Sequence, residues 1–173
     1  MPASRLKTVN VVSSFTYCAH AVDISAPVMP GVYKPKMRTR YVSMRYGTAM
    51  LFPTGRAVGF RSPSAAVARR AAHDVIEAVR AAIHDAELDA FSVQSTTSHA
   101  RCGHSVDLRA LAAAYPAQAT PRRFGVDFAA ATNVIVRVHA NGHCVLTATD
   151  AAVPHARTHW KAFAGDVLSK FLV

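Results

Sequence analysis

The sequence GTAMLFPTGRAV (residues 47–58) has strand-like alternation on both sides of a Pro-Thr-Gly turn at 53–55. That pattern predicts a β-hairpin, because alternate strand residues face opposite sides and glycine accommodates a tight turn. A large aromatic ring, Phe52, stands at the end of the incoming strand. The sequence NVIVRVHANGHCVL (residues 133–146) has the same layout about 87 residues later. The chain therefore contains this hairpin twice, which indicates an internal repeat.

The segments around the two hairpins recur in the same order. The first half predicts a strand over 7–15, at most a stub of helix before Pro27, a strand over 38–46 and, after the hairpin, a long helix with Ser62 as its N-cap. The second half predicts a strand over 90–98, a helix over 105–116, a strand over 122–131 and, after the hairpin, a helix from about Ala151. This is an α+β unit in duplicate, with repeats at 1–86 and 87–173.

Composition bounds the class of protein. Of the 173 residues 51% are apolar, so that a sizeable core can form. We find no apolar run of about 18 residues that predicts a membrane span, and no apolar signal-peptide core. Three cysteines (Cys18, Cys102 and Cys144) are too few and too scattered for a disulfide framework, which favours an intracellular, reducing compartment.

The positive charge is concentrated in the first half of the chain. The formal net charge is +10, of which residues 1–84 carry +9. Residues 34–61 hold seven basic residues and no acid. A basic run is often only a solvated surface, but this one covers two predicted strands and the turn between them. That arrangement favours a polyanionic partner.

Metal binding and catalysis have weaker signals. The sequence HARCGH offers His99, Cys102 and His104, and the pair His143 and Cys144 follows later. These spacings match none of the usual zinc patterns, and Cys18 stands alone. No Gly-rich phosphate loop and no Ser/His/Asp order is recognisable. We therefore expect no metal, no cofactor and no enzymatic activity.

The repeated order resembles the core domain of the TATA-binding protein family. The resemblance runs from about Leu6 to Phe171, and its order, spacing and duplication make it specific. The motifs that carry it are TVNVV at 8–12, YKPK at 33–36, TAMLFPTGRAV at 48–58, FSVQS at 91–95 and NGHCVLT at 141–147.

The resemblance implies a saddle-shaped α+β fold. Two pseudo-symmetric repeats would share a curved antiparallel sheet of ten strands, with four helices on the convex face. In the family, the concave face binds the widened minor groove of A·T-rich duplex DNA, and two pairs of phenylalanines wedge between base steps. The implied function is sequence-preferring DNA binding and bending at promoters by a general transcription initiation factor. The implied location is the nucleus, or the intracellular site of transcription.

The resemblance also implies a set of DNA-binding residues. Asn10 occupies a central asparagine position that bonds base edges, and Ser95 is its counterpart in the second repeat. Positions that contact the groove correspond to Val12, Val58, Val145 and Thr147. Basic phosphate contacts correspond to Arg45 and Arg56, and His143 replaces the second of these. Phe52 and Phe124 match wedge phenylalanines, while Thr39 (or Tyr41 in a shifted register) and His139 replace the other two.

Taken alone, Phe52 and Phe124 would more often be core rings than wedges, and only the duplicated context favours intercalation. The alternation in the second hairpin supports an uncovered face. Val134, Val136 and Val138 share one side of the strand, and Ile135, Arg137 and His139 share the other. A face with an arginine and a histidine is expected to meet solvent or a ligand.

General transcription factors are the other implied partners, with a monomer on DNA and a dimer conceivable without it. In the family, an acidic stretch docks transcription factor IIB. The corresponding sequence here, YPAQATPRRF (115–124), has two arginines and no acid, which predicts weak docking of that factor. An alternative function is therefore a decoy or regulatory module that binds transcription factors without strong DNA bending.

Overall fold

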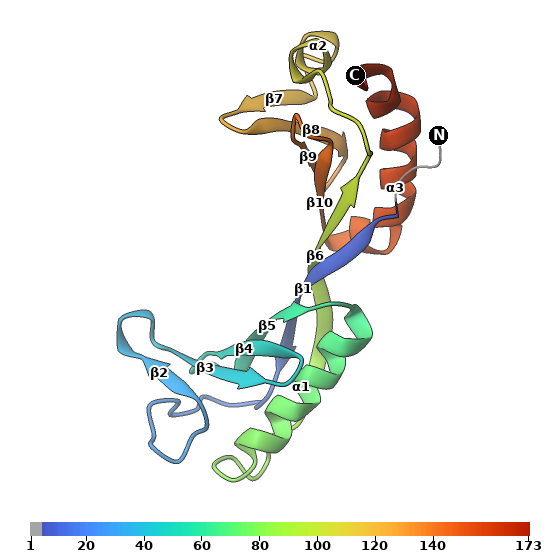
Figure 1. Cartoon of the computed structure of the whole chain (residues 1–173). Helices are drawn as coiled ribbons and strands as arrows, with labels where there is room; N and C mark the ends of the chain where they lie inside the picture. The colour runs from blue at the N-terminus through green and yellow to red at the C-terminus, as the bar shows by residue number, and fades with distance from the viewer. Residues whose placement is uncertain (1–4) are drawn as a thin grey trace. The chain divides into compact units, whose positions relative to one another are not determined.

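Ten strands and three α-helices form in residues 5–173, the part of the chain that the computed structural model describes (Figure 1). The first half contains β1 (Lys7–Thr16), β2 (Val32–Lys34), the 3-10 helix η1 (Pro35–Met37), β3 (Thr39–Met44), β4 (Gly47–Leu51), β5 (Arg56–Ser62) and α1 (Ala65–Val79). The second half contains β6 (Asp89–Arg101), α2 (Leu108–Ala114), β7 (Ala119–Arg122), β8 (Gly125–Ala131), β9 (Val134–Val138) and β10 (His143–Thr149). It ends in a continuous helical segment made of η2 (Asp150–His155), α3 (Ala156–Ala162), the π-helical η3 (Phe163–Val167) and η4 (Leu168–Phe171).

The strands are hydrogen-bonded in the order β2-β3-β4-β5-β1-β6-β10-β9-β8-β7. Counted outward from β1 in one direction and from β6 in the other, the two halves of this order correspond strand for strand. The chain thus has the α+β class predicted from the sequence and the ten-stranded antiparallel sheet that the family resemblance implied.

Two compact units divide the chain. The N-terminal unit is Val9–Gln94, and the C-terminal unit is Ser95–Val173 together with residues 5–8. The chain therefore changes unit within β1 and again within β6. The boundary between sequence repeats at 86 and 87 remains a prediction.

In the N-terminal unit, α1 covers one face of the strands (Figure 1). Burial alternates along β1, where Val11, Ser13 and Phe15 are buried and the residues between them are partly exposed. Helix α1 contributes Val75 and other small apolar residues to the same core. The expected N-cap was wrong by two residues. The side chain of Ser64 accepts a hydrogen bond from the backbone N–H of Val67, whereas the Ser62 hydroxyl donates to the Tyr46 carbonyl.

The C-terminal unit has the same layering. Val134, Val136 and Val138 of β9 are fully buried, and Ile135 between them is 51% exposed. Trp160 of α3 packs in the core beneath these strands. Helix α2 begins after Asp107, whose carboxylate accepts the backbone N–H of Ala110.

The helices differ from the expectation in number. Residues 17–31 form bends and turns, so the short helix considered for the first repeat is absent from the described structure. The second repeat keeps its counterpart as α2. Three α-helices replace the four that the family resemblance implied. No helix within residues 5–173 is long and apolar enough to cross a membrane.

Both predicted hairpins form, and a turn glycine holds each in place. Gly55 and Gly142 have φ values of +77° and +75°, in the region that favours glycine. A side chain on Gly55 would collide with the Cys18 carbonyl, and one on Gly142 with the His104 carbonyl. Each turn is therefore pressed against the segment that follows the first strand of its repeat.

Candidate nucleic-acid interface

Each unit has an open face, which we define as the side of its strands turned away from its helices. In the N-terminal unit, cross-strand pairing places Tyr41, Met50, Val58 and Ser14 in one row on this face. All four side chains are partly exposed. Val12, the other valine predicted to meet DNA in this unit, lies two residues before Ser14 and is also partly exposed. The row is mostly apolar, and no charged side chain interrupts it.

Phe52 lies at the tip of the β4–β5 hairpin. Its backbone N–H donates to the carbonyl of Arg56 at 2.9 Å, and its own carbonyl accepts the Tyr17 hydroxyl at 2.7 Å. The ring is half-buried and does not belong to the core cluster that the described residues of this unit form. A ring outside the core on a fixed backbone has the geometry that a wedge residue requires.

The predicted placement of Thr39 at a second wedge position is wrong. Its side chain is only 2% exposed, and its hydroxyl is enclosed without a hydrogen-bond partner. A side chain enclosed in this way cannot insert between bases. Tyr41, the alternative in a shifted register, lies in the row with Met50 and Val58 described above. Its ring meets Phe60 edge-on, at 6.5 Å between centroids.

Strand register gives Phe124 a counterpart in the N-terminal unit, and that counterpart is Arg38. Arg40 of β3 pairs with the last residue of β4, and Val126 of β8 pairs with the last residue of β9. The residues two places earlier, Arg38 and Phe124, therefore correspond. Arg38 is exposed and has a φ of +50°. Sequence reasoning missed this residue because the two repeats have different turn lengths before these strands.

Most of the basic stretch at 34–61 is exposed. Arg40 is the exception, at 5% exposure, because its guanidinium donates to the carbonyls of Met29 and Pro30. The other six cations are exposed, and none of them forms an ion pair with any residue in 5–173: Lys34, Lys36, Arg38, Arg45, Arg56 and Arg61. The N-terminal unit therefore presents six uncompensated positive charges.

Two of the predicted contacts in this unit have local partners. The Asn10 side-chain oxygen accepts the backbone N–H of Arg61 at 2.7 Å, next to an irregularity in the β1–β5 pairing. This bond orients the amide so that its NH₂ group remains for another acceptor. Arg45 lies in the β3–β4 turn, with its guanidinium 5.0 Å from the Tyr46 ring centroid. Arg70 of α1 lies 5.8 Å from the centroid of the same ring.

The open face of the C-terminal unit brings together most of its predicted contact residues. Val145 pairs with His99 on β6 and with Arg137 on β9. The next row contains Thr147, between Thr97 and Ile135, and Ser95 lies beside Thr149 at the end of β10. Ser95, Val145 and Thr147 are all partly exposed.

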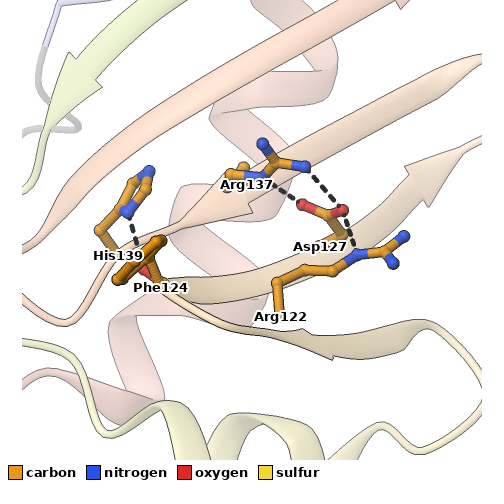
Figure 2. Close-up of polar contacts among 5 residues, drawn as sticks. All are labelled: Arg122, Phe124, Asp127, Arg137 and His139. Atoms are coloured by element: carbon orange, nitrogen blue, oxygen red, sulfur yellow. Dashed lines mark hydrogen bonds and ion pairs between the residues drawn. The ribbon is translucent and has the colours of Figure 1, made fainter.

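A carboxylate occupies the middle of this face. Asp127 of β8 accepts two hydrogen bonds from Arg137, at 2.7 and 3.0 Å, and one from Arg122 at 2.8 Å (Figure 2). Hydrogen bonds from Arg137 and, to a smaller extent, from Arg122 lower the pKa of Asp127 below its ordinary value. Two cations of this unit thus share one carboxylate. Asp127 was not singled out in the sequence because one acid in a strand has no distinctive spacing.

Three histidine rings meet at the end of the same face. The His143 ring lies 5.0 Å from His99, edge-on, and 5.5 Å from His139 in a stacked arrangement. Burial lowers the pKa of His143, and the neighbouring His99, His139 and Arg101 lower it further. His143 is therefore a neutral ring at pH 7, and it differs in this respect from Arg56, its counterpart in the first repeat.

Phe124 and His139 lie together at the outer tip of this unit (Figure 2). The Phe124 ring is 72% exposed, and Arg123 lies 4.9 Å above its centroid. His139 Nδ1 donates to the Phe124 carbonyl at 2.8 Å, which joins the β7–β8 turn to the β9–β10 turn. Each unit thus carries one phenylalanine and one nitrogen-containing side chain at its tip.

A hollow adjoins this tip on the side of α2. Most of the residues that line it are apolar, Leu108 and Val126 among them, and Arg109, Arg122 and Arg123 complete the lining. None of the residues that line it is acidic. The expected acid-free character of 115–124 therefore extends to the neighbouring surface.

Comparison with known proteins identifies the architecture. The sequence matches no family model and no curated protein. A solved structure, TBP from Methanococcus jannaschii, matches with a TM-score of 0.77 at 16% identity, over 96% of this chain and 99% of that one. The fold is TBP-like. The family resemblance in fold and the predicted fold class are thereby confirmed, while identity this low says nothing further about the residues on the open faces.

The ion pairs of Asp127 predict a specific pH dependence. Because its pKa is lowered in the folded protein, the carboxylate stabilises the fold above the unfolded pKa of about 3.9, and this contribution is lost as the pH falls through the folded value. We expect Asp127→Asn to lower the free energy of unfolding at pH 7 by about 1–2 kcal/mol, since the arginines are half exposed and screened.

Urea unfolding at about pH 7 and pH 3 measures this effect. The variant should lose less stability than the wild type between the two pH values. Asp166→Asn, at an exposed position without an ion pair, is the control and should follow the wild type. An equal loss in Asp127→Asn and wild type would contradict the assigned role.

Proposed function

We propose that the protein binds duplex DNA through the open faces of its two units, bends it, and acts as a TBP-like transcription initiation factor at promoters. The observation that carries the proposal is the combination of six exposed, unpaired cations with aromatic rings at the hairpin tips, outside the core. The function is one of binding, without a catalytic step. Its location would be the nucleus or the intracellular site of transcription.

Electrostatics supports a nucleic-acid partner. Phosphate groups are the usual ligands of surfaces on which several lysines and arginines lack acidic neighbours. In the N-terminal unit, Arg38 and Arg56 flank the tip that carries Phe52, so cations and ring can act on the same stretch of duplex. Phosphate contacts position a protein on DNA, and the apolar row between them meets the groove.

The chemistry of the open faces favours the minor groove. Val12, Val58 and Val145 offer apolar surface without fixed donors, which suits a groove whose pattern distinguishes mainly A·T from G·C pairs. The free NH₂ group of Asn10 can donate to the adenine N3 or thymine O2 acceptors that A·T pairs expose there. A·T-rich, deformable sequence would therefore be preferred.

The two units would contribute unequally. The N-terminal unit has six free cations, whereas in the C-terminal unit one carboxylate, Asp127, engages two arginines and His143 is neutral. A neutral imidazole stacks on a base but adds no long-range attraction. We therefore propose that the N-terminal unit dominates affinity, and that His139 and Arg38 make a shallower bend than four phenylalanines would.

Salt dependence tests the phosphate contacts. Each contact released by salt changes the slope of log K against log [salt] by about −0.9. Replacing both Arg45 and Arg56 with alanine should flatten the slope by about two units, because two contacts are lost. The double variant Arg157→Ala, Lys161→Ala removes the same charge from the exposed side of α3 and should leave the slope unchanged. Equal slopes in the wild type and both double variants would refute the placement of phosphate contacts at Arg45 and Arg56.

Bending tests the wedge rings. Phe124→Ala and Phe52→Ala should each increase the end-to-end distance of a short, bound A·T-rich duplex, measured by fluorescence transfer, because the bend becomes shallower. The affinity at low salt should change little, because the phosphate contacts remain. Phe124→Ala should leave the unfolding midpoint unchanged because its ring is 72% exposed.

The matched control for Phe52 is its neighbour. Leu51 is fully buried, and Leu51→Ala should cost about 2–5 kcal/mol of stability without a specific effect on the bend. If Phe52→Ala shows that stability loss and no change in bend, Phe52 is a core residue.

The hollow beside α2 bears on protein partners. Arg109, Arg122 and Arg123 surround it, whereas the family docks transcription factor IIB on an acidic surface. We expect little recovery of a conventional transcription factor IIB in a DNA-free pull-down, and more with Arg109→Glu, Arg123→Glu, because like charges then become opposite. The same reversal at Arg157 and Lys161 is the control. Tight capture by the wild type without DNA bending would favour the decoy function instead.

A further inference from the structure

We propose that Cys18, His20 and Asp85 form a binding site for a thiophilic divalent cation of the Zn²⁺ type, behind the hairpin tip that carries Phe52. The ligand atoms of the three residues (a sulfur, an imidazole nitrogen and a carboxylate oxygen) all lie within 4.8 Å of one another. Among residues 5–173, this is the one group of three such side chains that meets this distance. The inference is independent of DNA binding.

The geometry of the two exposed ligands suits an ion. His20 Nδ1 lies 3.0 Å from the Ala21 carbonyl, which can only accept, so Nδ1 carries a proton. In the metal-free protein Nε2 donates its proton to Asp85 Oδ2 at 3.0 Å, so a bound ion would take the place of this proton between the two ligands. A backbone carbonyl that fixes the tautomer in this way is the usual support of a metal-binding histidine. Nitrogen and oxygen ligands of a tetrahedral zinc lie about 3.3 Å apart, so only a small adjustment would admit the ion between them.

Cys18 completes the site from the protein side. It is 3% exposed, while the side chains of His20 and Asp85 are 61% and 64% exposed. A bound ion would thus have a sulfur ligand from below, nitrogen and oxygen ligands at the surface, and a fourth position open to solvent. A thiolate in the set favours zinc over magnesium or calcium, which prefer oxygen.

The repeat provides an internal comparison. The C-terminal unit has the same Cys-x-His spacing at Cys102 and His104, also against a turn glycine, Gly142. There the Cys102 sulfur lies 3.3 Å from the carbonyl oxygens of both His104 and Gly142, either of which can accept its single S–H proton, and no acidic side chain completes a group. Asp85 therefore distinguishes the proposed site from its counterpart, which has the same Cys-x-His spacing.

The position of the site gives the ion a mechanical role. The backbone N–H groups of Tyr17 and Cys18 donate to the Gly55 carbonyl at 2.8 and 3.2 Å, and the Tyr17 carbonyl accepts the N–H of Glu87. The Tyr17 hydroxyl reaches the Phe52 carbonyl. An ion that joined the segment after β1 to Asp85, before β6, would clamp both to the turn of the β4–β5 hairpin. It would therefore raise the stability of the tip.

Cobalt(II) is the probe for this site, with the full-length chain carrying no histidine tag. We expect one equivalent to bind with a thiolate-to-cobalt charge-transfer band, and Zn²⁺ to abolish the band by displacement. The band should disappear in Cys18→Ser and persist in Cys102→Ser. Either the lack of a thiolate band in the wild type, or its loss in Cys102→Ser with persistence in Cys18→Ser, would overturn the assignment.

Two surface variants keep the test independent of folding, since a change at buried Cys18 could disturb the fold. His20→Gln and Asp85→Asn should each weaken Co²⁺ and Zn²⁺ binding at least about 100-fold, because each removes one of three ligands. Their unfolding midpoints in metal-free buffer should stay close to wild type, and Zn²⁺ should raise the midpoint of the wild type but of neither variant. His104→Gln is the matched control. Wild-type affinity in His20→Gln and Asp85→Asn would exclude the site.

Discussion

The contact between each hairpin turn and the segment after the first strand of its repeat holds the molecule's exposed tips in place. Gly55 and Gly142 adopt a positive φ and lie against the backbone so closely that no other residue fits. Because the turn is held from behind, its strand ends cannot move independently of the core. Phe52 and His139, at the same place in the two hairpins, are consequently presented on fixed backbone outside the core.

The two units share this frame but differ in charge. The N-terminal unit keeps six exposed cations unpaired, whereas in the C-terminal unit Asp127 holds Arg122 and Arg137 (Figure 2). An intramolecular carboxylate competes with any phosphate for these two guanidinium groups. Because the N-terminal unit has more unpaired positive charge, a polyanion would be attracted to that unit more strongly than to the other. This asymmetry would orient the protein on its ligand.

Several residues that look functional in the sequence have a structural role. Arg40 belongs to the basic stretch, yet it is buried and ties the loop near Met29 to β3 through backbone carbonyls. Asn10 accepts a backbone N–H beside a strand irregularity, so one half of its amide supports the sheet and the other half remains free. Composition and motif matching assign these side chains to the surface, because neither describes where a side chain's partners are.

Local patterns predicted the order of the elements and their duplication. The period-two alternation in the strands, the two turn glycines, the helical spacing after β5 and the 87-residue repetition can all be recognised along the chain without knowledge of its contacts. The ten-stranded sheet was implied by the family resemblance. These patterns did not predict the cap of α1 or the absence of the short helix in the first repeat. Ser62 and Ser64 are equally good caps by residue type, and tertiary contacts decide which of them is used.

Only the tertiary structure decided which side chains are available for function. It placed Arg38 rather than Thr39 at the second tip position, because strand register depends on the pairing of β3 with β4. It joined Asp127 to two arginines, and it brought His20 and Asp85, 65 residues apart in the chain, to 3.0 Å beside Cys18. These contacts join segments that are far apart in the chain. They form only when the strands pair and pack, so no local sequence pattern predicts them.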